Sequence, residues 1–140
     1  GGEAKKTDNH EIGLFEIQPT KEGRSHALLK NFNFSDKWVN VHLVEVSKPP
    51  KGSTIWHSSS DCHNHIMQFS ENAFSCQFHP EVCGHTFEGW MCIPGIPSSL
   101  ENLLGKDGLE NFQDEFTKNL SSNNKASQTL FNNWCDLVFN

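Results

Sequence analysis

The stretch from Trp38 to Val46 alternates in side-chain character, and no other feature limits the possible folds of this chain as strongly. One face of such a strand carries Trp38, Asn40, His42, Val44 and Val46, and the other carries Val39, Val41, Leu43 and Glu45. A period of two is typical of a β-strand, and the missing backbone donors of Pro49 and Pro50 end the pairing. The chain therefore contains a sheet that the rest of the fold must cover.

Four other segments of the first two thirds have strand character. They are Glu11–Thr20, Ser53–Ser58, Ile66–Phe69 and Ala73–Phe78. In the first of these, apolar residues stand among polar ones, and Pro19, Glu22 and Gly23 supply a turn. The last runs directly into His79 and Pro80, where an ordinary strand cannot continue. Short strands therefore dominate the first two thirds.

The last third changes to a helical period. Ser98 and Glu101 have the spacing of a capping box, and Gly105 stands where a helix would end, so a short helix is predicted between them. Two further apolar stripes follow, interrupted by the polar residues 121–125, which are too few for a domain linker. The stripes are Leu109, Phe112, Phe116 and Leu120, then Ala126, Leu130, Trp134, Leu137 and Val138. The pattern predicts one domain that is strand-rich in its first two thirds and helical in its last third.

Charge and composition narrow the class of protein. The net charge of −6 argues against nucleic acid or an anionic membrane as the main partner, because both attract basic surfaces. No apolar run reaches the roughly eighteen residues of a membrane span, and the first residues lack the apolar core of a signal peptide. The five cysteines are irregularly spaced, which favours reduced thiols. We expect a soluble cytoplasmic protein.

The segment QFHPE, residues 77–81, is the strongest candidate for chemistry. Residues two apart in an extended chain project from the same face, so the carboxylate of Glu81 can reach the imidazole of His79. A histidine with a carboxylate partner has a defined tautomer and can act as a base towards a neighbouring thiol. A strand-end histidine beside a surface glutamate is the simpler interpretation of the triplet taken alone.

Several segments in addition to QFHPE resemble the GMP-synthase-like branch of class I glutamine amidotransferases. These are EIGLFEIQPTKEG at 11–23, residues 41–69, EVCGHTFEGW at 81–90 and LFNNWCDLVF at 130–139. The resemblance implies a flavodoxin-like α/β domain that hydrolyses the side-chain amide of glutamine or a γ-glutamyl compound through a Cys-His-Glu triad. In that triad, His79 is the base and Glu81 its orienting partner. Neither a cofactor nor a metal is implied.

The resemblance also implies that the nucleophile stands earlier, on a Gly-rich elbow, and none of the five cysteines lies in such a motif. Residues 1–140 are therefore expected to be the C-terminal portion of one amidotransferase domain. The N-terminal strands and the Cys elbow would come from a missing N-terminal segment or a complementary chain, and a synthetase or larger assembly is a possible partner. His42 is kept from a His-rich family stretch near the active site, which makes it a candidate for substrate binding.

Two other interpretations compete. Zinc-type ligands occur at Cys62, His63, His65, Cys83 and His85. Cys62 and His65 have the spacing of half a zinc site, but Cys83 and His85 are closer together than usual, so ordinary loop residues and buried thiols are the preferred interpretation. The second alternative is a non-catalytic structural or interaction subunit that keeps the amidotransferase fold.

Overall fold

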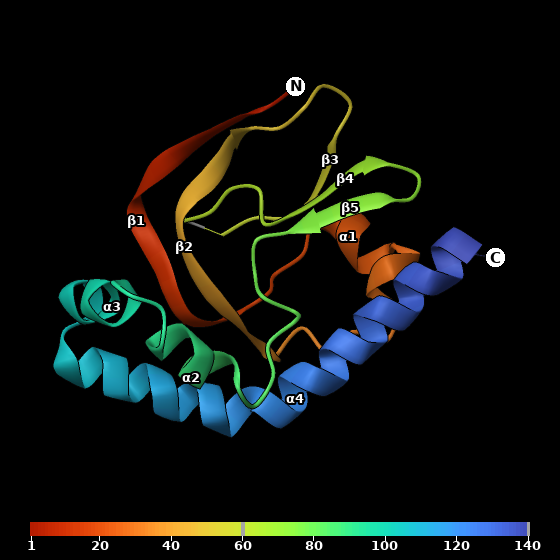
Figure 1. The fold of residues 1–140 in the computed structure, drawn as a ribbon. Helices are drawn as coiled ribbons and strands as arrows, with labels where there is room; N and C mark the ends of the chain where they lie inside the picture. Colours follow the sequence, from red (N-terminus) through yellow and green to blue (C-terminus); the bar gives the residue numbers. More distant parts are fainter. Residues whose placement is uncertain (60, 140) are drawn as a thin grey trace.

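The computed structural model describes residues 1–59 and 61–139 and has a mixed α/β architecture (Figure 1). The strands are β1 Glu3–Glu16, β2 Lys37–Lys48, β3 Thr54–His57, β4 Ile66–Ser70 and β5 Ala73–Cys76. The helices are α1 Lys21–Ser25, α2 Thr86–Met91, α3 Ile96–Leu104 and α4 Lys106–Phe139, with a 3-10 turn at Ala27–Leu29. The described helices lack an apolar stretch of the length needed to cross a bilayer.

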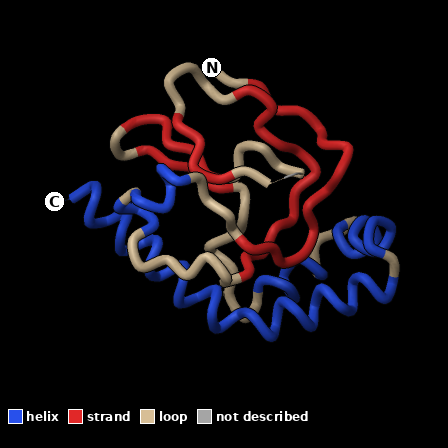
Figure 2. Tube along the Cα trace, turned by 180° about the vertical axis from the view of Figure 1, so that it is seen from behind, coloured by secondary structure: helices blue, strands red, loops and turns tan. Residues whose placement is uncertain are grey.

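The described strands form two antiparallel sheets, β1-β2 and β3-β4-β5. All five predicted strands are present, although β1 begins at Glu3 and β5 ends at Cys76, before Phe78. In the first sheet, Glu11 pairs with His42, and the register is irregular between Lys6 and Glu11. Figure 2 shows the strands gathered on one side of the long helix α4.

The turn predicted at Pro19 to Gly23 is in part a short helix, α1. The Thr20 side chain accepts a hydrogen bond from the Gly23 backbone nitrogen at 3.1 Å, which caps the helix and explains why it begins there. Gly23 is also required sterically, because a Cβ atom at this position would lie 2.6 Å from the backbone oxygen of Trp56. The close approach joins α1 to β3.

The capping box predicted at Ser98 and Glu101 is wrong. α3 begins earlier, at Ile96, after Gly95, whose φ of 88° suits glycine. Ser98 lies inside the helix, and its hydroxyl donates to the Gly95 carbonyl at 3.1 Å. The predicted end at Gly105 is confirmed, with φ at 72°.

The helix break predicted at residues 121–125 is also wrong, because α4 is continuous over 34 residues. Asn123, in the middle of the polar run, is buried, and its side-chain amide donates to the backbone oxygens of Lys37 and Asn119. A polar residue with such partners can face the core of a helix without breaking it. The helix α2 was not predicted; its buried residue is Phe87.

The core consists of two clusters, one on each side of β2. Trp38 packs in the first cluster, with Trp56, Phe78 and Ala126. The next residue, Val39, packs in the second cluster, whose other buried members are Ile12, Val82, Phe87, Leu100, Phe112 and Phe116. Both faces of β2 are therefore covered at its first residues, which explains why both of its predicted faces begin with apolar side chains.

Candidate active site

His79 and Glu81 lie in direct contact. The Nδ1 atom of His79 is 2.6 Å from Oε1 of Glu81, a charge-assisted hydrogen-bond distance. The His79 side chain is 30% exposed and that of Glu81 is 67% exposed, so the pair lies at the surface. Because Nδ1 faces the carboxylate, Nε2 is the ring nitrogen left to meet a substrate or a thiol.

The backbone and the neighbouring side chains hold His79 in place. Its backbone nitrogen donates to the Val39 carbonyl of β2 at 2.8 Å. The preceding Phe78 is buried against Trp38, with ring centroids 4.5 Å apart. The ring of Trp90, in α2, meets the His79 ring edge-on at 5.6 Å. Both core clusters and α2 therefore fix the position of this histidine.

Neither cysteine that is close to His79 in sequence contacts it among the recorded interactions of the described residues. The Cys76 thiol donates to the Phe78 carbonyl at 3.5 Å, and burial raises the pKa of Cys76 to about 12. Cys83 is exposed and takes a hydrogen bond from the Thr86 hydroxyl at 3.5 Å. That bond and one from the His85 backbone lower the pKa of Cys83. All five cysteines are free thiols.

A second, buried polar cluster lies between the sheets. The Oε2 atom of Glu11 is 2.5 Å from Nε2 of His65 and 3.1 Å from Nε2 of His42, while the Ser59 hydroxyl donates to Oε1 at 2.7 Å. The thiol of Cys62 interacts with the His65 ring. The structure thus brings His42 to Glu11 and His65, and none of its recorded contacts within the described residues is with His79 or Glu81.

The cluster perturbs the charges of its members. Burial alone would raise the pKa of Glu11, but hydrogen bonds from the two histidine rings and the Ser59 hydroxyl outweigh it and hold the pKa well below its usual range. Burial acts to lower the pKa of His65, whereas contacts with Cys62 and Glu11 raise it, to about 9. Together these shifts favour an ionised pair of Glu11 and His65.

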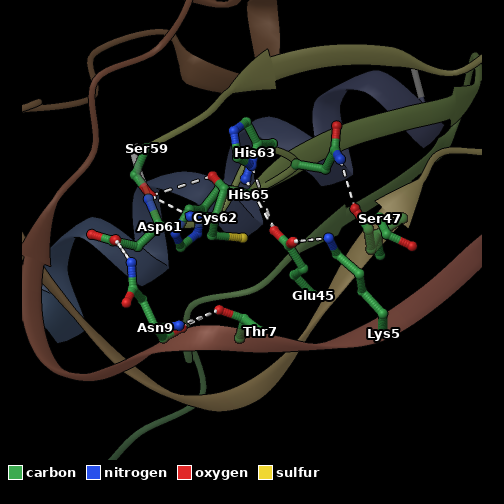
Figure 3. A network of polar contacts seen from close by, with 12 residues as sticks. Lys5, Thr7, Asn9, Glu45, Ser47, Ser59, Asp61, Cys62, His63 and His65 are labelled. Carbon is green, nitrogen blue, oxygen red and sulfur yellow. Dashed lines mark hydrogen bonds and ion pairs between the residues drawn. The ribbon is translucent and has the colours of Figure 1, made fainter.

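The zinc-type ligands singled out in the sequence separate into different places. Cys62 and His65 lie in the buried cluster, whereas His63 points outward, with its Nδ1 3.7 Å from Oε2 of Glu45. Figure 3 shows this arrangement, with Lys5 on the other side of Glu45. Cys83 and His85 are exposed at the start of α2. Sequence reasoning missed Glu11, because alternation puts it on the face opposite to Ile12 and Leu14, where a strand with one apolar face leaves a carboxylate in solvent.

A groove of about 630 Å³ runs between β4-β5 and the C-terminal half of α4. Its apolar side chains include Leu28, Phe74, Phe78, Leu130, Phe131 and Trp134. Pro80 and Glu81 lie along the same groove, while Phe131 is 56% exposed. The groove therefore borders the His79–Glu81 pair and presents an apolar surface.

Comparison with known proteins gives one consistent result. The sequence profile of the family described as glutamine amidotransferase class-I matches residues 3–91, more than half of the chain. Among curated proteins, the chain is similar to GMP synthase (glutamine-hydrolyzing) of Clostridium botulinum strain Hall, at 27% identity over 118 residues. That match covers 84% of this chain and 22% of that enzyme.

Two solved structures share the fold. SMU.1228c matches with a TM-score of 0.77 and 18% identity, over 96% of this chain and 56% of that chain. A glutamine amido transferase from Methylobacillus flagellatus matches with a TM-score of 0.74 and 19% identity, over 98% of this chain and 56% of that one. The chain thus spans just over half of these structures and about a fifth of the curated relative.

Proposed function

This chain belongs to the class I glutamine amidotransferase family and has its flavodoxin-like α/β fold, and from that premise we propose that it carries the base of a glutamine-hydrolysing Cys-His-Glu triad. His79 is the base and Glu81 the residue that orients it. The observation that carries the proposal is the 2.6 Å contact between His79 Nδ1 and Glu81 Oε1, which leaves Nε2 for chemistry.

The chemistry follows from this arrangement. Nε2 of His79 takes the proton of a cysteine thiol, and the thiolate attacks the side-chain amide carbon of glutamine. The imidazolium then returns the proton to the leaving nitrogen, which departs as ammonia and leaves a thioester. Water, activated by the same nitrogen, hydrolyses the thioester to glutamate and the free thiol. Glu81 keeps Nδ1 protonated and stabilises the imidazolium in both steps.

The thiol is assigned to a Gly-rich elbow outside residues 1–140, either upstream in the same domain or in a complementary chain. Burial keeps Cys76 protonated, and the recorded contacts of Cys83 are with Thr86 and not with the base. The missing part of the domain also supplies the oxyanion donors. We propose that its strands cover the apolar groove beside Glu81; the chain matches 56% of each solved relative, which leaves length in those relatives for such strands.

Glutamine, or a γ-glutamyl compound, is the substrate class we propose, since the curated relative is named as glutamine-hydrolyzing. The ammonia acceptor is assigned to a partner domain or subunit, because GMP synthase joins a synthetase activity to glutamine hydrolysis in its name. His42 is not assigned to substrate binding, because its neighbours are Glu11 and His65.

The test is steady-state ammonia release from glutamine by the full-length protein. The variant His79→Ala is expected to lose about 10²–10⁴-fold in kcat, the usual contribution of a general base. His85→Ala is the matched control, because His85 is exposed six residues further on and is expected to keep the wild-type rate. Loss in both variants, or in neither, contradicts the assignment, and the absence of ammonia release by the wild-type protein favours the non-catalytic subunit.

A further inference from the structure

The buried cluster between the two sheets is not used by the triad, yet it gathers four side chains that bind metals. We propose that Glu11, His42, Cys62 and His65 form a four-ligand site for one zinc ion that stabilises the fold. The sequence predicted no metal here, because Cys62 and His65 lacked a second pair of ligands. The structure provides that pair from distant strands, as Glu11 and His42.

The distances fit a compact site. One ligand atom from each of the four residues lies within 4.8 Å of all the others. Ligands on a tetrahedral zinc ion, with bonds of about 2.0–2.3 Å, are separated by about 3.3–3.8 Å. The Glu11 carboxylate is already 2.5 Å from the His65 ring and 3.1 Å from the His42 ring. Side-chain shifts of about 1 Å therefore suffice to place an ion among the four.

The donor set selects the metal. Two imidazole nitrogens, one thiolate and one carboxylate oxygen form a mixed nitrogen, sulfur and oxygen set that suits zinc and disfavours magnesium or calcium. Four protein ligands complete a tetrahedral shell and leave no open position. Cys62 is fully buried, and Glu11 and His65 are 3% exposed. A closed, buried site of this kind is structural rather than catalytic.

The hydrogen bonds of the cluster show which nitrogen of each histidine faces Glu11. The Nδ1 atoms of His42 and His65 are buried, and neither makes a hydrogen bond among the described residues. Since Nε2 of each ring faces Glu11, an ion among the four residues would be bound by the two Nε2 atoms, and each Nδ1 would then carry the ring proton.

The surroundings of the thiol also suit a bound metal. The side-chain amide of Gln77 points its nitrogen at the Cys62 sulfur from 3.8 Å, and N–H groups around a ligating sulfur stabilise its anionic form. Ser59 holds the loop by accepting from the Cys62 backbone nitrogen at 2.8 Å and donating to Glu11. Figure 3 shows Ser59, Cys62 and His65 together on the loop that leads to β4.

The site would join the two sheets. Glu11 is on β1 and His42 pairs with it on β2, while His65 directly precedes β4 of the second sheet. The His65 carbonyl accepts from the Gln77 backbone nitrogen at 2.9 Å, two residues before His79. Metal binding is therefore expected to stabilise the strand end that carries the proposed base, without taking part in the reaction.

The experiment strips the full-length protein with a chelator and titrates it with Co²⁺, then with Zn²⁺. One equivalent of Co²⁺ is expected to give the visible bands of tetrahedral cobalt and a thiolate-to-cobalt charge-transfer band, and Zn²⁺ is expected to abolish both. The melting temperature is expected to rise with Zn²⁺. These readouts do not depend on ammonia release, so an inactive protein would not obscure them.

Two variants test the ligands against matched controls. Cys62→Ser is expected to lose the charge-transfer band, and His65→Gln to weaken Co²⁺ binding by more than about 100-fold, beyond the loss typical of outer-shell partners. Cys83→Ser and His63→Ala change exposed residues of the same types and are expected to bind as wild type. The proposal is overturned if Co²⁺ does not bind, if the wild-type spectrum lacks the thiolate band, or if the control variants lose as much Co²⁺ binding as the ligand variants. If Cys62→Ser does not fold, the wild-type thiolate band decides.

Discussion

The Nδ1 atom of His79 lies 2.6 Å from Oε1 of Glu81, and the two residues are separated only by Pro80. The proline restricts His79 to an extended backbone, while the hydrogen bond from its nitrogen to Val39 fixes the residue against β2. The ring orientation therefore depends on the Glu81 carboxylate and on the Trp90 ring, and each dependence can be tested separately.

Replacing Glu81 by Gln should leave the shape of the site intact but allow the imidazole to adopt the wrong tautomer. We expect kcat for ammonia release from glutamine to fall by about 10²–10⁴-fold, with KM changed little. Glu88→Gln is the matched control, since Glu88 is an exposed glutamate in the neighbouring helix. A Glu81→Gln enzyme with wild-type kcat would remove the carboxylate from the mechanism.

Trp90 is proposed to position the His79 ring through its edge-on contact at 5.6 Å. Trp90→Ala is expected to reduce kcat by about tenfold or more, because small displacements of a reacting group are costly. Trp90→Phe keeps an aromatic ring and should recover most of the rate. If both variants lose the same activity, the indole acts through the fold and not through the histidine, which thermal unfolding of the two variants would reveal.

Cys83 and Cys76 should differ strongly in reactivity. Hydrogen bonds from Thr86 and the His85 backbone lower the pKa of the exposed Cys83, so its thiolate fraction, and its alkylation rate, level off at a lower pH than for a free thiol. Burial raises the pKa of Cys76 to about 12, so its alkylation should stay slow throughout the neutral range. Mass spectrometry after timed iodoacetamide treatment measures both, and Thr86→Val should slow Cys83 near pH 7. Faster labelling of Cys76 than of Cys83 would contradict the assignment.

Asn123 should be important for stability. From the middle of α4, its side-chain amide donates a hydrogen bond to the Lys37 carbonyl. Because Asn123→Ala leaves that carbonyl without this donor, we expect the free energy of unfolding to fall by about 1–3 kcal/mol. The adjacent and exposed Asn124 provides the control, because Asn124→Ala removes no buried partner. Urea unfolding of the full-length variants measures the difference, and equal stability of the two would show that the buried hydrogen bond contributes little.

Local spacing decided what could be predicted from the sequence. The contact of His79 with Glu81 follows from two residues in an extended chain, and the strand β2 follows from its alternation. The contact of Glu11 with His65 joins residues 54 apart, and only the packing of two sheets brings them together. No pattern among neighbouring residues in the sequence reveals a contact between residues so far apart.

The helical last third of the chain also has features that the local sequence pattern did not predict correctly. The polar residues 121–125 resemble a break when they are considered alone, and only the backbone of β2, which Asn123 contacts, explains why α4 continues. Ser98 has the spacing of a cap, but the positive φ of Gly95 had already provided the helix start. A tertiary partner decided the first case, whereas the second depended on Gly95, a local signal that competed with the spacing of Ser98 and Glu101.

The proposed mechanism depends on His79 acting as the base that activates a thiol. The most direct measurement is a single turnover of glutamine with the full-length enzyme in excess, following the first-order release of ammonia. We expect His79→Ala to slow this step by about 10²–10⁴-fold relative to wild type, while glutamine binding is retained. A single-turnover rate equal to that of wild type would contradict the central claim.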